Sequence, residues 1–322
     1  MSGWWRLREA VLRRARGPYL ALGQLDARMH DTQRRLTALE EALTISRQTR
    51  ELAVQTRDLA EATHQLLTGE MRAMLRALAA EESANRRRLY ELRAEPDYGA
   101  AWAEPRPLVT VTVATRNRPE LLATRSLPSI LGQSYGELEV IVVGDSADAS
   151  TEEVVRGFAD PRLAFRNLPH RVHISDDPRR RWLVAATMAR NEAARVAGGR
   201  WIVQFDDDDE MHADCIERLV ERARDGEPEA VYGRVLARRQ DEPPFELGAF
   251  PPQVGRFTWA AGMYHAGLRF FQRELFAADL GVPGDWFLAE RMLRAGVRFA
   301  MVDEVLSDIY PSAMNQVQPD RG

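Results

Sequence analysis

The chain changes character near residue 100. From Ala21 to Glu95 it contains no proline and only two glycines, whereas after Pro105 proline and glycine recur every few residues. Proline breaks a helix interior and glycine weakens it, so only the first stretch can form one long helix. The change predicts four parts: a helical region at 1–95, a linker at 96–107, a compact domain at 108–311 and a tail at 312–322.

Apolar residues in the helical region alternate at spacings of three and four. The first series is Leu22, Leu25, Met29, Leu36, Leu39 and Leu43, with Thr32 filling the gap. It meets the poor core residues Ser46 and Arg50, and a second series follows with Leu52, Leu59, Leu66, Leu67, Met71, Met74 and Leu78. The pattern predicts two coiled-coil-like stretches, or one helix with a register shift. Such a stripe needs a partner, either a second copy in a homo-oligomer or the other domain of the same chain.

Residues 1–20 interleave apolar side chains such as Trp4 and Trp5 with arginines. This mixture suits an interfacial helix on anionic lipid, and it equally suits an amphipathic helix that packs on protein. No apolar run approaches the length of a membrane span. The single cysteine, Cys215, cannot form an internal disulfide. We therefore expect a cytoplasmic protein, with peripheral contact to the inner face of the membrane as an option.

All 44 basic residues are arginine. The absence of lysine excludes a lysine Schiff base and the lysine of a phosphate-binding P-loop. The formal net charge of −4 gives no sign of nucleic-acid binding.

Strand and helix patterns alternate after the linker. Strands are expected at 108–114, 138–143, 201–205 and 230–237, and helices at 119–131, 151–158, 181–196, 214–224 and 285–295. Such alternation predicts an α/β domain with a mostly parallel sheet. Sheets of this kind bind ligands beyond the carboxyl ends of their strands.

Four successive aspartates, Asp206 to Asp209, follow the apolar strand at 201–205. Their charges repel one another unless a cation lies among them, and oxygen ligands favour Mg²⁺ or Mn²⁺. The alternative is a solvated turn in which Asp209 or Asp214 caps the next helix.

Two further strand ends carry polar loops. Thr115, Arg116 and Asn117 lead from the first strand toward a helix N-terminus, as in a nucleotide-contact loop. Asp145 follows the second strand, where its carboxylate could accept from a nucleobase or a ribose hydroxyl, or close a turn before the next helix.

Three ordered passages within 107–311 resemble family 2 glycosyltransferases. They are the strand with Thr-Arg-Asn-Arg-Pro at 115–119 and its acid-rich turn at 144–148, Ala-Arg-Asn at 189–191 followed by the aspartate run, and Gly-Asp-Trp-Phe-Leu at 284–288 before Arg291. The resemblance implies a GT-A fold, an αβα sandwich that binds a nucleotide sugar and a divalent metal.

The resemblance also implies roles for individual residues. Nucleotide-sugar contacts fall on Thr115, Arg116, Asn117, Asp145, Arg190, Asn191, Asp206 and Asp207. Metal ligation falls on Asp206 and Asp208, with Asp208 the direct ligand, and Asp285 matches the general base. Gly144 and Gly284 depart from the family pattern, because an acid usually occupies each position. The segment 168–182 has no counterpart.

Trp286, Tyr264 and His265 are candidates for the acceptor side, with core packing as the alternative for each. The expected activity is metal-dependent, inverting transfer of a sugar from a nucleoside-diphosphate sugar, most readily a UDP-sugar, with Mn²⁺ or Mg²⁺. The acceptor hydroxyl belongs to a glycan, lipid carrier, natural product or polypeptide. A nucleotidyltransferase-like enzyme and a catalytically degenerate GT-A scaffold are the alternatives.

Overall fold

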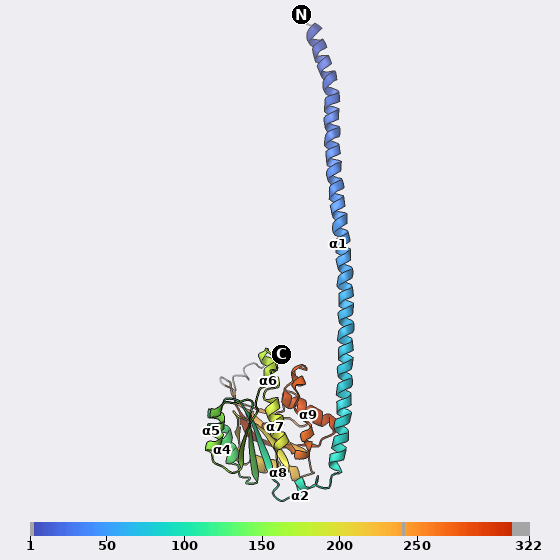
Figure 1. Ribbon diagram of the computed structural model, residues 1–322. Coiled ribbons are helices and arrows are strands. Elements are labelled where there is room, and N and C mark those ends of the chain that lie inside the picture. Colours follow the sequence, from blue (N-terminus) through green and yellow to red (C-terminus); the bar gives the residue numbers. More distant parts are fainter. Residues whose placement is uncertain (1–2, 240–241, 311–322) are drawn as a thin grey trace. The chain divides into compact units, whose positions relative to one another are not determined.

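A computed structural model describes residues 3–239 and 242–310 (Figure 1). The chain divides into two compact units, Met1–Leu78 and Ala79–Gly322. Helix α1 (Gly3–Arg93) begins in the first unit and ends in the second. Among the described residues, no helix combines the length and the apolarity needed to cross a membrane. The long N-terminal helix predicted from the missing prolines is confirmed.

One mixed sheet organises the second unit. Within the described residues its strands follow the order β3-β2-β1-β4-β8-β6-β9-β5, and β7 pairs with β6. The strands are β1 (Val109–Thr115), β2 (Leu138–Gly144), β3 (Leu163–Asn167), β4 (Trp201–Asp206), β5 (Glu210–Met211), β6 (Ala230–Ala237), β7 (Phe245–Leu247), β8 (Gly262–His265) and β9 (Phe299–Ile309). Strands β3, β2, β1 and β4 are parallel, whereas β8 runs antiparallel to both β4 and β6. The α/β sandwich is confirmed, and the sheet is parallel in its first half and mixed beyond it.

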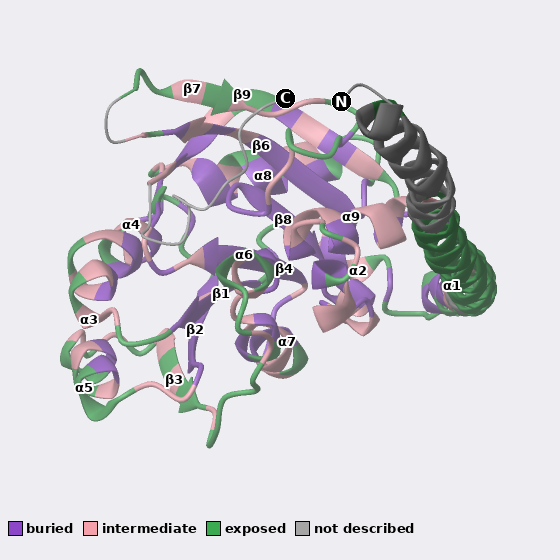
Figure 2. Ribbon diagram, turned by 90° about the horizontal axis from the view of Figure 1, so that it is seen from above, coloured by how far each residue is buried: buried purple, intermediate pink, exposed green. Residues whose placement is uncertain are grey.

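Helices cover both faces of the sheet (Figure 2). They are α2 (Ala100–Ala103), α3 (Pro119–Leu121), α4 (Leu127–Leu131), α5 (Ala149–Gly157), α6 (Pro178–Leu183), α7 (Thr187–Val196), α8 (Cys215–Arg224) and α9 (Gly284–Ala295), with shorter turns η1 (Leu122–Ser126), η2 (Ala266–Phe270) and η3 (Leu275–Ala278). Because side chains alternate along a strand, Val111 and Val113 of β1 pack into the core under α4 and α8. Ile141 and Val143 of β2 pack against α7 on the other face.

Two predicted helices differ in detail from the observed ones. Residues 119–131 are helical throughout, but a π-helical segment, η1, interrupts the α-helix. The helix expected at 181–196 is split into α6 and α7, because Ala186 adopts a left-handed conformation with φ of 56°. A lone alanine in this conformation carries no sequence signal, since glycine or asparagine normally occupies it.

The segment at 96–107, expected to be a linker, is packed into the second unit. Tyr98 and Ala101 are buried, and the Trp102 indole donates to the Pro228 carbonyl at 3.1 Å. The end of α1 is packed in the same way, with Leu89 and Leu92 in the core. Proline and glycine content alone could not reveal this packing, since it depends on distant partners.

A buried carboxylate fastens this end of α1. Glu229 is fully buried and accepts two hydrogen bonds of 2.7 Å from the Arg93 guanidinium. It also accepts from the Tyr98 hydroxyl and, at 2.8 Å, from the Arg298 backbone N–H. Burial opposes ionisation of Glu229, but these donors outweigh it and hold its pKa below the usual range.

Deleting residues 1–78 should therefore leave the second unit folded, whereas deleting residues 1–95 should unfold it. The longer deletion removes Leu89, Leu92 and the Arg93 partner of Glu229, which strands a buried charge. The single substitution Arg93→Met should cost about 3 kcal/mol in free energy of unfolding, measured by urea denaturation. Arg87→Met, an exposed arginine on the same helix, is the matched control. Equal stability of the two truncated chains would contradict this role for residues 79–95.

Candidate active site

The carboxyl ends of three adjacent parallel strands meet at one edge of the sheet. Strand register places Ala114 of β1 beside Asp206 of β4, and Thr115 beside Gly144 of β2. The loops that leave these strands carry most of the polar residues singled out from the sequence. The sequence interpretation therefore brought the right segments together, because parallel strands share a carboxyl edge.

Asp207 turns toward β1. Its carboxylate accepts from the Thr115 hydroxyl at 2.7 Å and from the Arg118 guanidinium at 2.9 Å. Arg118 also donates to Asp208 at 2.8 Å, whereas Arg116 is exposed. Arg118 is thus a site residue that the sequence interpretation missed. Nothing in the Thr-Arg-Asn-Arg-Pro sequence distinguishes the arginine that turns inward.

Asp206, Asp208 and Asp209 form a carboxylate cluster, with one oxygen from each lying within 4.8 Å of the others. Burial raises the pKa of Asp208 to about 6, and the charges of Asp206 and Asp207 add to the effect. Burial and the charges of Asp206 and Asp208 raise the pKa of Asp209 well above its usual range. Three hard oxygen donors, with the charges of Asp208 and Asp209 penalised by burial, fit a divalent cation such as Mg²⁺ or Mn²⁺.

Asp209 joins this cluster unexpectedly, because the sequence predicted only Asp206 and Asp208 as ligands. The Tyr310 backbone N–H donates to its carboxylate at 2.9 Å, directly after β9 ends. The sequence feature that could have pointed to Asp209 as a ligand was its place in the run of four aspartates. Its burial depends on β9, which the sequence interpretation did not predict.

Helix α7 contributes two of the predicted residues. The Arg190 guanidinium donates to the Asp206 carboxylate, and its side chain is largely buried. Asn191 faces the other way and brackets the backbone of Arg273, donating to its carbonyl at 2.9 Å and accepting from its N–H at 2.8 Å. Asn191 therefore fixes a neighbouring segment, whereas Arg190 lies at the acidic cluster.

Asp285 lies in the first turn of α9, where the helix dipole favours a negative charge. One carboxylate oxygen, Oδ2, accepts from the Thr258 hydroxyl at 3.0 Å and from the Trp259 backbone N–H at 3.1 Å. The other, Oδ1, accepts from the Arg273 guanidinium at 2.6 Å. Burial opposes ionisation, but the charges of Arg273 and Arg190 prevail and hold the pKa of Asp285 well below its usual range.

Arg273 is the second site residue that the sequence interpretation missed. It is buried, and its guanidinium also donates twice to the Gln204 side-chain oxygen, at 2.8 and 2.6 Å. Gln204 lies two residues before Asp206 on β4, so Arg273 links the candidate base to the strand that carries the acidic cluster. Its only signal was an arginine within the apolar segment around Phe270 and Phe271, a weak hint of a buried ion pair.

The loops after β1 and β2 are joined to each other. The Asp145 backbone N–H donates to the Thr115 carbonyl at 2.9 Å, and the Asp148 N–H donates to the Asn117 side chain at 2.9 Å. The Asp145 carboxylate is buried and lies 3.3 Å from the Arg171 guanidinium. The Asn117 side chain therefore holds the loop after β2 against the loop after β1.

Gly144, one of the two departures from the family pattern, lies against Asn167 at the end of β3. A Cβ at position 144 would lie 2.5 Å from the Asn167 side-chain oxygen and 2.9 Å from the Ala147 Cβ. The Asn167 amide uses that space to hold Ala147, accepting from its N–H at 2.9 Å and donating to its carbonyl at 2.8 Å. A side chain at position 144 would collide with Asn167, which explains why glycine occupies this position.

The segment 168–182, which has no counterpart in the family pattern, is held by ion pairs near both of its ends. Arg171 pairs with Asp145 near its start, and Arg180 of α6 pairs with Asp279 after η3. His173 is exposed and lies 3.8 Å from Asp176.

The three acceptor-side candidates lie in different surroundings. Strand register pairs His265 with Trp201, the first residue of β4, so His265 lies at the edge opposite Asp206. Tyr264 is fully buried, and its hydroxyl accepts from Gln204 at 3.0 Å. Both residues pack in the core, as the alternative interpretation held. Trp286 is half-buried and adjoins Asp285, so it stays a candidate.

Comparison with known sequences agrees with this arrangement of strand ends. The sequence profile described as glycosyl transferase family 2 matches residues 110–279, more than half of the chain. The chain belongs to glycosyl transferase family 2. The matched residues include Thr115, Asp145, Arg190 and the aspartate run, whereas Asp285 lies beyond them.

Curated relatives of this family 2 chain include proteins named for the biosynthesis of succinoglycan, colanic acid and teichuronic acid. The succinoglycan biosynthesis protein ExoO of Rhizobium meliloti is 33% identical over 117 residues, which are 36% of this chain and 30% of that protein. An N-acetylglucosaminyltransferase of the same organism is 32% identical over 238 residues, covering 65% of this chain and 53% of its own length. The chain thus spans about a third to a half of these relatives.

Solved structures with a similar fold are more distant. TarS 1-349 of S. aureus in complex with UDP has a TM-score of 0.49 and 17% identity, covering 64% of this chain and 61% of that one. The mannosyltransferase PcManGT of Pyrobaculum calidifontis, in complex with GDP-Man and Mn²⁺, has a TM-score of 0.43 and 22% identity, covering 74% and 66%.

Proposed function

We propose that this family 2 protein is an inverting glycosyltransferase that moves a sugar from a nucleoside-diphosphate sugar to an acceptor hydroxyl. One observation carries the proposal: an ionised carboxylate, Asp285, and a carboxylate cluster suited to a divalent cation are linked through Arg273 and Gln204. Such a pair of groups supports attack on one side of a sugar and departure of a phosphate on the other.

The departing diphosphate needs compensation for its charge. Mn²⁺ or Mg²⁺ held by Asp206, Asp208 and Asp209 would supply that compensation as a Lewis acid. Arg118 and Arg190, which pair with the aspartates in this structure, are close enough to bind phosphate oxygens instead. Thr115 and Asn117 order the loops that would border the donor. The Asp145 carboxylate, which pairs with Arg171 in this structure, would exchange that partner for a ribose hydroxyl or a nucleobase.

Asp285 would take the proton from the acceptor hydroxyl. Because Oδ2 already accepts two hydrogen bonds and Oδ1 accepts one, the free lone pair belongs to Oδ1. Arg273 therefore keeps Asp285 ionised. Thr258 and the Trp259 N–H occupy Oδ2, which leaves Oδ1 to face the acceptor. A single carboxylate on the acceptor side, without a covalent sugar intermediate, gives inversion at the anomeric carbon.

Two alternatives make different products. A nucleotidyltransferase would release pyrophosphate from a nucleoside triphosphate, whereas a glycosyltransferase releases a nucleoside diphosphate. A degenerate scaffold would release neither. The hydrogen bonds that order Asp285 and Asp207 argue against degeneracy, since a site without function has no need of oriented, buried carboxylates.

The partners and location stay predictions. A UDP-sugar is the first donor to test, and the acceptor class is open. A cytoplasmic location stays a proposal that rests on the single cysteine of the sequence, Cys215. Membrane contact through residues 1–20 rests on side chains that, apart from Arg6, lie outside those the structure describes.

A thermal-shift panel of UDP-, GDP- and dTDP-sugars with Mn²⁺ or Mg²⁺ tests the proposal. We expect one nucleotide series to raise the melting temperature by about 5 °C or more at ligand concentrations near 100 times Kd, and only with the metal present. The matching nucleoside diphosphate should then appear as product when acceptors are screened. Absence of any metal-dependent stabilisation, or release of pyrophosphate, would contradict the proposal.

A further inference from the structure

Large apolar side chains are exposed along the described part of α1 in the first unit. They are Met29, Leu36, Leu39, Leu43, Ile45, Leu52, Leu59, Leu66, Leu67 and Met71, and each exposes more than half of its surface. Scattered exposed leucines are common, but a periodic series on one helix marks a surface that another element covers.

The series forms two seams, each a line of core positions spaced alternately by three and four residues. The two seams differ in register. The first runs through Met29, Leu36 and Leu43, with Thr32 and Leu39 between them. The second places an aliphatic residue at every seventh position, Ile45, Leu52, Leu59 and Leu66, with threonines at 49, 56 and 63. The step from Leu43 to Ile45 shifts the heptad frame by one residue, which a coiled coil absorbs as a local change of winding.

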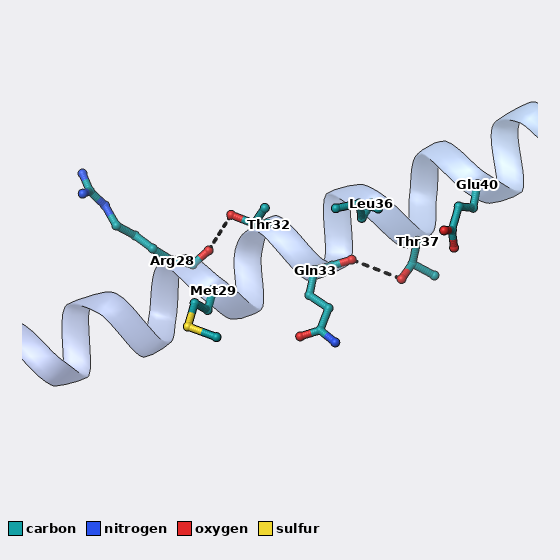
Figure 3. Close-up of a pocket in the computed structure, with 7 residues that line it drawn as sticks. All are labelled: Arg28, Met29, Thr32, Gln33, Leu36, Thr37 and Glu40. Atoms are coloured by element: carbon teal, nitrogen blue, oxygen red, sulfur yellow. Dashed lines mark hydrogen bonds between the residues drawn. The ribbon is translucent and has the colours of Figure 1, made fainter.

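The threonine hydroxyls of the second seam have hydrogen-bond partners within the helix itself. The hydroxyls of Thr49, Thr56 and Thr63 each donate at 2.8 Å to the backbone carbonyl four residues earlier. Thr32 of the first seam does the same, as Figure 3 shows beside Met29 and Leu36. With the polar atom satisfied within the helix, these side chains can enter an apolar interface at little cost.

Charge is excluded from the flanks of the second seam. In the coiled-coil frame, the flanking positions carry Ser46, Gln48, Ala53, Gln55, Ala60, Ala62, Leu67 and Gly69. The charged residues between 45 and 69, namely Arg47, Arg50, Glu51, Arg57, Asp58 and Glu61, all occupy the far side. Threonine, which is β-branched, alternates with leucine in the core, and this alternation favours two parallel strands.

The flanks of the first seam set the direction of pairing. Arg28 and Arg35 occupy one flank, and Gln33 and Glu40 the other. In a parallel pair in register, Arg35 of each copy meets Glu40 of the other. In an antiparallel pair, like flanks meet, so arginines would face arginines. The charge pattern therefore selects the parallel arrangement.

We propose that α1 pairs with α1 of a second copy of this chain, parallel and in register, from Met29 to Leu66. The pairing is independent of the proposed reaction, because none of its residues belongs to the active site. It places two active sites in one assembly, which raises the effective concentration of the second site for an acceptor that offers several hydroxyls.

Cysteine cross-linking of the full chain tests this pairing on a clean background, since Cys215 is the one native cysteine and is buried. Leu52→Cys and Leu66→Cys, made separately, should each form disulfide-linked dimers under mild oxidation, because identical core residues meet in a parallel pair. Val54→Cys, on the far side of the same turn, is the matched control and should stay unlinked.

Light scattering of the unmodified chain provides a second readout and should give a mass near twice 36.5 kDa. A monomeric mass would overturn the proposal, and so would a mass of three or more copies. Cross-linking only in a mixture of the Leu52→Cys and Leu66→Cys chains would indicate antiparallel helices and would also overturn it. Equal linking at Val54→Cys would mean random collision.

Discussion

Asp285→Asn is expected to slow sugar transfer by about 10²-fold or more while leaving nucleotide affinity unchanged. Asparagine keeps the shape and can still accept from Thr258 and the Trp259 N–H, but it cannot take a proton from the acceptor. The proposed nucleotide contacts lie at the ends of β1, β2 and β4 and on α7, so we expect them not to change. Initial rates with saturating donor and a separate nucleotide titration measure the two quantities.

The substitution also leaves the buried Arg273 guanidinium without its carboxylate, so stability needs its own measurement. Asp279→Asn is the matched control, because it removes one negative charge from an exposed position nearby in the chain. If nucleotide affinity fell together with transfer in a stable Asp285→Asn protein, Asp285 would be structural and the proposed base would be wrong.

Asp208→Asn is expected to weaken Mn²⁺ binding by 10-fold or more and to abolish metal-dependent transfer. The same change should stabilise the metal-free protein by about 1 kcal/mol or more. The pKa of Asp208 is raised to about 6 because its charge is buried beside Asp206 and Asp207, so removing that charge relieves repulsion. A structural carboxylate would instead lose stability when it is neutralised.

Calorimetric titration of chelator-treated protein with Mn²⁺, together with urea unfolding in chelator, measures both effects of Asp208→Asn. Asp214→Asn serves as the control, because Asp214 follows the cluster along the chain and pairs with Arg218 at the surface. Unchanged Mn²⁺ affinity in Asp208→Asn would remove Asp208 from the proposed ligands, whatever happened to the rate.

The sequence predicted the part of the site that depends on strand order along the chain. Thr115, Asp145 and Asp206 follow strands with strong apolar and β-branched patterns, and parallel strands bring their ends together. It could not predict contacts that depend on the later, irregular half. Arg273 reaches Asp285 from a segment without regular periodicity, and β8 places His265 at the opposite edge because it runs antiparallel to β4.

The helical region was likewise predicted from the sequence only in part. The absence of proline predicted a long helix, but no local signal revealed that its last turns are packed with the sheet through Leu89, Leu92 and Arg93. The anchoring group, Glu229, lies more than a hundred residues further along the chain. The change in composition therefore placed the start of the compact domain at residue 108, whereas the packing places the start of the second unit at Ala79.

The close contact between position 144 and Asn167 has a consequence for how this edge of the site can change. An acid at 144 needs space that the Asn167 amide occupies, and shortening Asn167 alone would release the loop at Ala147. The two positions must therefore change in one step, in evolution as in design. Under the proposed donor contacts, discrimination between nucleobases would depend on one carboxylate, Asp145, so a redesign of donor preference would begin with the 144–167 pair.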